Sequence, residues 1–178
     1  MFLLNKKHDI WFFNQSTHCT NCYHINSKWS GNICLLVSMI CILKQPYLLG
    51  DLLHLCKHRF SPIYGWRHAD VISWWLQLGL RFYKIRLRFF ASLCLILLSI
   101  RWPFIVSVSP TLYMKTWGTS GHLVVVYGLI ISKWKVYLHI HDPGLWGDDT
   151  WKQFIINLPE FMHFFSKNII LTGKLQSE

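Results

Sequence analysis

Acidic residues are scarce in this chain of 178 residues. It has 8 Asp and Glu against 18 Lys and Arg, which gives a formal net charge of +10. An excess of this kind favours contact with anionic surfaces or nucleic acid. The basic residues are dispersed, however, and the densest group, over residues 81–88, alternates with apolar side chains. Such alternation is typical of a solvated face beside a buried one, so we expect no nucleic-acid partner.

A long uninterrupted apolar segment is also missing, although 52% of the residues are hydrophobic. The best candidate span, Phe89 to Ile100, is closed by Arg88 on one side and by Arg101 on the other. Crossing a bilayer takes about 20 apolar residues, whereas a run of about 10 to 14 is typical of a buried helix. The N-terminus does not resemble a signal peptide, so export is not supported. The run and its flanking arginines leave a membrane-associated protein as an alternative.

The cysteines lack the dense, regular spacing of a disulfide scaffold. There are six of them, and Cys41, Cys56 and Cys94 lie inside apolar runs. Free cysteine behaves as a small apolar residue in such surroundings. We therefore expect these three to be buried, reduced thiols.

Near the N-terminus four soft metal ligands lie close together: His18, Cys19, Cys22 and His24. A structural zinc site generally needs a second pair of ligands farther along the chain. Cys56 and His58 could supply that pair, but their spacing does not match a common zinc finger. A zinc-binding interaction protein is thus a second alternative, while the principal interpretation requires no cofactor.

Secondary-structure signals change in character along the chain. Residues 1–27 show no sustained period and predict an arm, followed by one domain over residues 28–174. Apolar residues at helical spacing predict helices over 49–60 and 68–78, and continuous apolar runs predict buried helices over 32–44 and 89–100. Runs rich in β-branched and aromatic residues predict strands over 80–85, 104–108, 123–129, 136–140 and 168–172, with 151–165 helical or irregular. Helices followed by an antiparallel sheet predict an α+β fold.

Three residues, in chain order, fit the chemistry of a cysteine nucleophile. Cys34 stands at the start of the first predicted helix, where the helix dipole lowers the pKa of a thiol. His122 precedes the predicted strand 123–129, and Asp142 follows the strand 136–140. If these strands pair as a hairpin, His122 and Asp142 come to the same end of the sheet. We predict Cys34 as nucleophile, His122 as general base and Asp142 as the group that orients the histidine.

The flanks of these residues resemble a known family. Residues 120–128, SGHLVVVYG, and 137–143, YLHIHDP, resemble the histidine and aspartate motifs of papain-like cysteine peptidases of the bacteriocin-processing, double-glycine type. Their pattern is Gly-His, a hydrophobic strand, Gly, and then a strand that ends in Asp-Pro. The resemblance covers residues 28–171. It implies a papain-like fold, a peptide or protein substrate, and hydrolysis of a peptide or isopeptide bond.

Two departures from the family pattern affect the expected site. Leu35 follows Cys34, where the family commonly has glycine. The family also has an upstream glutamine that helps to form the oxyanion hole, and Gln15 is the only glutamine before Cys34. By resemblance, Gln15 is the candidate for that role; without it, backbone N–H groups at Cys34 would bind the oxyanion. Because Trp, Leu and Ile replace polar loops of the family, an inactive copy of such a peptidase is a further alternative.

Overall fold

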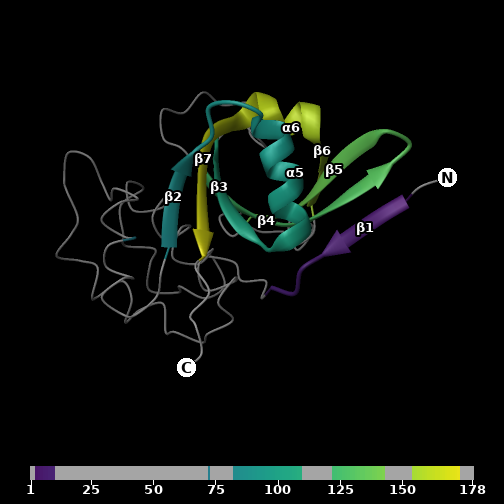
Figure 1. Ribbon diagram of the computed structural model, residues 1–178, viewed down its shortest axis with the longest axis horizontal. Coiled ribbons are helices and arrows are strands. Elements are labelled where there is room, and N and C mark those ends of the chain that lie inside the picture. The colour runs from purple at the N-terminus through teal and green to yellow at the C-terminus, as the bar shows by residue number, and fades with distance from the viewer. Residues whose placement is uncertain (1–2, 11–71, 73–81, 110–121, 143–153, 173–178) are drawn as a thin grey trace, which may run out of the picture.

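The computed structural model describes residues 3–10, 72, 82–109, 122–142 and 154–172 of the chain. Figure 1 shows the elements of these segments, which combine one sheet with two helices. In chain order they are β1 (Leu3–Lys7), β2 (Phe82–Arg86), α5 (Ala91–Arg101), β3 (Phe104–Val108), β4 (His122–Ser132), β5 (Lys135–His141), β6 (Phe154–Asn157), α6 (Leu158–Phe164) and β7 (Phe165–Thr172). Within these segments the predicted α+β class is confirmed.

The strands form one antiparallel sheet of seven strands within the described segments. Six of them follow the order β2-β7-β3-β4-β5-β6, and β1 pairs separately with β4. The long strand β4 can pair with both β3 and β1 on the same edge, because its first half pairs with β3 and its second half with β1. A bulge at Tyr127 separates the two halves, since the register toward β5 shifts between Val126 and Gly128. Bulges bend a strand locally and increase its twist.

The hairpin on which the proximity of His122 and Asp142 was conditional is present. β4 and β5 pair from Ser132 opposite Lys135 to Val125 opposite His141. Lys133 and Trp134 form the connection with positive φ angles of 47° and 68°. Positive φ at both central residues is the mark of a type I′ turn, whose twist matches that of paired strands. The open end of this hairpin therefore lies at the start of β4 and the end of β5.

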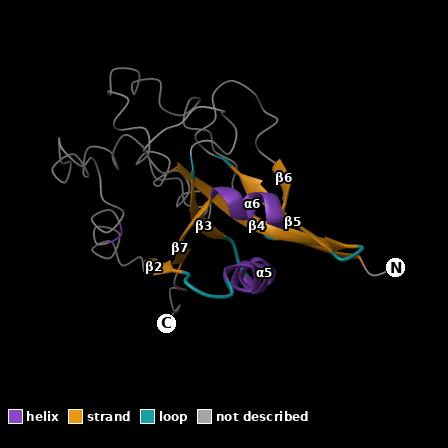
Figure 2. Cartoon of the chain, turned by 90° about the horizontal axis from the view of Figure 1, so that it is seen from above, coloured by secondary structure: helices purple, strands orange, loops and turns teal. Residues whose placement is uncertain are grey.

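The main core lies between the sheet and the two helices. Leu95 of α5 and Phe161 of α6 are fully buried against alternate residues of the central strands, among them Val106 and Val124. Phe161 also stacks on Phe165, with 5.7 Å between the ring centroids. Figure 2 shows α5 lying along one face of the sheet. All five residues of β3 are buried, so both faces of the sheet are covered along this strand.

Side-chain hydrogen bonds hold two of the elements in place. The ring Nε2 of His8, just after β1, donates to the carbonyl oxygen of Ser99 in α5 at 2.9 Å. At the start of α6, the side-chain oxygen of Asn157 accepts from the backbone N–H of Glu160 at 2.8 Å. The Asn157 amide in turn donates to the Glu160 carboxyl at 2.9 Å, which completes a reciprocal cap.

Several expected elements differ from those observed. Residues 3–7 were expected to belong to an arm but form β1, which pairs with β4. The backbone partners of this strand come from a distant part of the chain, so the local sequence pattern does not indicate them. Residues 154–157 form strand β6 before α6 begins, within a segment expected to be helical or irregular. Short apolar runs such as FIIN do not distinguish strand from helix by periodicity. The expected helices over 32–44 and 49–60, and the boundary at residue 28, lie outside the described residues. Within the expected helix over 68–78 the structure describes Ile72, which is helical and buried.

Helix α5 also differs from the buried helix that was expected. Only Leu95 and Ser99 are fully buried, while Leu93 and Leu97 are about half exposed. Cys94 is a free thiol, as expected, but is only partly buried. No helix within the described segments has the length and apolar character needed to span a membrane.

Candidate active site

The open end of the β4–β5 hairpin brings two of the predicted site residues to the same part of the sheet. His122 is the first residue of β4, and its backbone pairs with Val108 of β3. Asp142 comes directly after His141, the last residue of β5, which pairs with Val125. His122 precedes Val125 by three residues on the neighbouring strand. The two backbones thus reach the end of the sheet opposite the Lys133–Trp134 turn.

Asp142 occupies a protected position at this end. Its residue is only 2% exposed, and the preceding His141 is also buried. A carboxyl group at such a position costs free energy unless it is hydrogen-bonded or paired. This buried position therefore suits a carboxylate that accepts a hydrogen bond from another polar group of the protein rather than one that is solvated by water.

The other predicted site residues lie outside the described residues. This applies to Cys34 and Gln15, and to the cysteine and histidine group over residues 18–24 proposed as a zinc alternative. Among the side chains that the structure describes, no three His, Cys, Asp or Glu gather closely enough to hold a metal ion.

A second polar group, made of His139, Asn5 and Tyr127, lies in the middle of the same hairpin. It was not identified from the sequence. His139 of β5 is buried, and its Nε2 lies 3.2 Å from the side-chain oxygen of Asn5 in β1, to which it can donate. Its other ring nitrogen, Nδ1, is buried without a hydrogen-bond partner among the described residues. The ring of Tyr127 lies 5.5 Å from that of His139, centroid to centroid. In the sequence, His139 and His141 alternate with Leu138 and Ile140. Because alternate residues of a strand share a face, this pattern could have indicated that both histidines lie on one face of the sheet.

Burial shifts the proton affinity of both rings. Burial, together with the nearby charge of Lys7, lowers the pKa of His139 to about 4. Burial raises the pKa of the Tyr127 hydroxyl to about 12. Both shifts favour the neutral form, because a charge is poorly solvated in the protein interior. At neutral pH this polar group therefore carries no charge of its own.

The low pKa of His139 predicts an acid-sensitive contribution to stability. Between the usual histidine pKa of about 6.5 and the folded value of about 4, the unfolded chain binds a proton that folded His139 does not. The free energy of unfolding should therefore fall by about 2–3 kcal/mol as pH decreases through this window. In a His139→Gln variant that part of the pH dependence should be absent. Urea unfolding of both proteins at several pH values measures the difference.

Exposed His163 of α6 offers the matched control, because His163→Gln removes an imidazole without disturbing a buried site. If wild type and His139→Gln lose stability equally between neutral pH and pH of about 4, the buried neutral state of His139 is contradicted.

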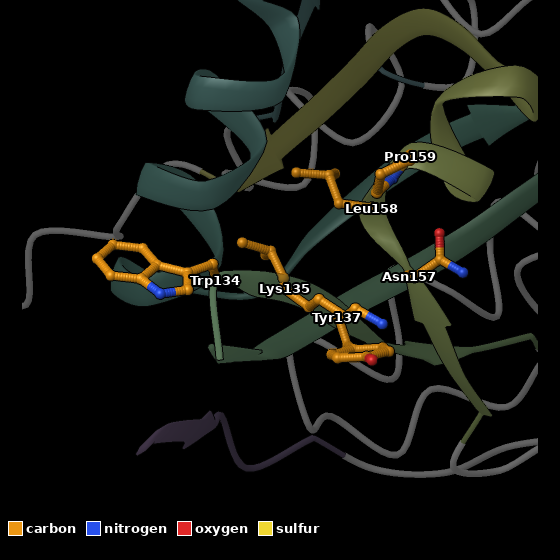
Figure 3. A pocket seen from close by; sticks show the side chains of 7 residues that line it. Trp134, Lys135, Tyr137, Asn157, Leu158 and Pro159 are labelled. Atoms are coloured by element: carbon orange, nitrogen blue, oxygen red, sulfur yellow. The ribbon is translucent and has the colours of Figure 1, made fainter. Parts of the chain in front are cut away.

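A surface hollow lies at the other end of the hairpin. It has a volume of about 350 Å³ and is lined by residues of the β4–β5 turn, of β5 and of the start of α6 (Figure 3). Tyr137 and Asn157, which pair across β5 and β6, contribute to its wall together with Leu158. Because this hollow adjoins the turn and not the open end, it is separate from the His122 and Asp142 positions.

Comparison with solved structures places this architecture among known folds. The crystal structure of a double-glycine-motif protease from an AMS/PCAT transporter, in complex with the leader peptide, matches with a TM-score of 0.59 at 15% identity. The match covers 95% of this chain and 97% of that one. The chain has the fold of a double-glycine peptidase domain. The predicted resemblance is thereby confirmed at the level of fold.

A second structure with the double-glycine peptidase fold agrees with this result. The peptidase domain of Streptococcus ComA, a bifunctional ABC transporter involved in a quorum-sensing pathway, matches with a TM-score of 0.56 at 20% identity. That match covers 84% of this chain and 94% of the ComA domain. No protein-family model matches the sequence, and neither does any curated protein. The double-glycine peptidase fold is therefore evident from the three-dimensional arrangement rather than from overall sequence identity.

Proposed function

We propose that this chain is a cysteine peptidase that hydrolyses a peptide bond at a double-glycine motif of a leader peptide. The observation that carries the proposal is the hairpin of β4 and β5 within a double-glycine peptidase fold, whose open end holds the His122 and Asp142 backbones. The solved neighbour bound to its leader peptide supports a peptide as the substrate class. Buried Asp142 supports a role in orienting an imidazole.

The proposed reaction follows the chemistry of a Cys-His-Asp triad. His122 accepts the thiol proton of Cys34, and the thiolate attacks the carbonyl carbon of the scissile bond. The side chain of Gln15 or the backbone N–H of Cys34 stabilises the oxyanion of the tetrahedral intermediate. His122 then donates its proton to the leaving amine, and an acyl-enzyme forms on Cys34. Water, deprotonated by His122, hydrolyses this thioester and restores the thiol, while Asp142 orients the imidazolium throughout.

The proposal predicts a selectively reactive thiol at Cys34. A cysteine activated by an imidazole is a thiolate well below the ordinary thiol pKa of about 8.5. Iodoacetamide should therefore label Cys34 below pH of about 7, with mass spectrometry to identify the labelled residue. In His122→Ala this labelling should move toward the pH range of an ordinary thiol.

Cys94 provides an internal comparison, because it is a free, partly buried thiol in α5. Cys34→Ala should abolish the low-pH label and leave the label on Cys94 as it is in wild type. A Cys34 that is silent, or that reacts only at alkaline pH with and without His122, would contradict the proposed nucleophile.

A further inference from the structure

Helix α5 leaves an apolar face uncovered on the outside of the domain. Leu95 and Ser99 are buried against the sheet, whereas Leu93 and Leu97 are 52% and 51% exposed. Phe89 and Phe90, immediately before the helix, are 79% and 80% exposed. Single exposed apolar residues are ordinary on protein surfaces, but a contiguous group marks a binding surface.

Helical geometry aligns three of the exposed apolar side chains. Leu97 follows Leu93 by four residues and Ile100 follows Leu97 by three, so these three lie on one side of α5. Phe89 and Phe90 add two exposed rings immediately before the first turn of the helix. We call this set of five residues the α5 face. Because Leu95 and Ser99 are the buried residues of α5, the exposed Leu93 and Leu97 lie on the side of the helix turned away from the sheet.

The backbone at the start of the helix is also unusual. Phe90 caps α5 in the left-handed region, with φ 50° and ψ 33°, and its side chain makes no capping hydrogen bond. Left-handed backbone is uncommon for residues other than glycine, asparagine and aspartate. Local strain of this type often accompanies functional surfaces, where the conformation serves an interaction. Here it accompanies two adjacent exposed phenylalanines.

Positive charge surrounds the α5 face at both ends. Arg86 and Arg88 precede it, Arg101 follows it, and all three are exposed. Residues 71–141 contain no aspartate or glutamate at all. Trp102, at the end of the helix, is 38% exposed and adds an aromatic ring to the arginine end. An apolar helix face bordered by arginine and tryptophan suits the interface of a lipid bilayer, where anionic headgroups lie above apolar acyl chains.

We propose that the α5 face binds the surface of an anionic phospholipid bilayer, with α5 parallel to the membrane plane. The phenylalanine and leucine side chains enter the boundary between headgroups and acyl chains, while Arg86, Arg88 and Arg101 contact lipid phosphates. This binding is independent of the proposed peptidase chemistry, because none of these residues belongs to the Cys34, His122 and Asp142 set.

Flotation of the full chain with vesicles tests the proposal. The protein should float with phosphatidylcholine vesicles that contain phosphatidylglycerol, remain unbound with phosphatidylcholine alone, and dissociate as salt screens the arginines. A Phe89→Ser and Leu93→Gln double variant should bind anionic vesicles at least about tenfold more weakly, because both side chains lose apolar contact. Thermal unfolding should match wild type, since both residues are exposed.

Trp134→Ser supplies the matched control, because Trp134 is fully exposed at the β4–β5 turn and lies outside the α5 face. It should bind as wild type does. Three results would overturn the proposal: no binding to anionic vesicles, equal binding to neutral vesicles, or equal loss in Trp134→Ser. A dimer in sedimentation that the α5 double variant dissociates, without vesicle binding by wild type, would instead assign the α5 face to a second copy of this chain.

Discussion

Replacement of Cys34 by alanine is expected to reduce hydrolysis of a double-glycine peptide by a factor of about 10⁴ or more. Without a thiolate no acyl-enzyme forms, and the remaining oxyanion and binding contacts supply only residual catalysis. His122→Ala should cost a similar factor, because the thiol then has no general base. The measurement is kcat/KM for a peptide that contains a Gly-Gly bond, followed by chromatography of the products.

The variants should also show that the three residues act as one unit. The double variant Cys34→Ala with His122→Ala should be no slower than either single variant, because members of a triad are strongly non-additive. The loss of kcat/KM in Asp142→Asn should not exceed that in Cys34→Ala, since the role proposed for Asp142 is to orient the imidazole rather than to contact the substrate.

Cys41→Ala is the matched control for this series, because Cys41 lies in the same predicted helix seven residues beyond Cys34. It should cleave the peptide as fast as wild type. Equal activity in wild type and Cys34→Ala would refute the proposed nucleophile, and an inactive wild type with an unreactive Cys34 would indicate an inactive copy of the fold.

Replacement of Gly128 by valine is expected to destabilise the domain by about 3 kcal/mol. A Cβ atom at this position would overlap the carbonyl oxygen of Lys6 and lie 2.9 Å from the Cα of Lys7. Both neighbours are backbone atoms of β1, so no change of side-chain rotamer relieves the overlap. Either β1 separates from β4 or the sheet distorts, and the midpoint of urea unfolding should fall accordingly.

Hydrogen exchange gives the local readout for Gly128→Val. The backbone amides of β1 should exchange much faster than in wild type, while those of β3 should change less. Ile130→Val is the matched control, because Ile130 lies two residues along β4, opposite Asn5 of β1, and its loss of one methylene should cost about 1 kcal/mol. Unchanged exchange in β1 of Gly128→Val would show that β1 does not pack closely over this glycine.

Particular residues show how far local patterns predicted the fold and where they failed. The run Phe104–Val108 was predicted with the bounds of β3, and the valine run after His122 was predicted as the strand that became β4. Both are mainly apolar segments bounded by turn-forming residues, so consecutive residues along the chain are enough to predict a buried strand. β1 was missed because its LLNKK sequence carries mixed residues, and its strand conformation depends on β4.

The candidate site shows the same division. The sequence alone indicated the residue types of a cysteine peptidase, their order Cys34, His122 and Asp142, and the strands that flank the last two, because these are properties of neighbours along the chain. The three-dimensional arrangement was needed to establish that β4 and β5 pair as a hairpin, that His139 is buried against Asn5, and that the α5 face is exposed. Burial and exposure are set by which distant elements pack on a residue, and periodicity along one segment does not contain that information.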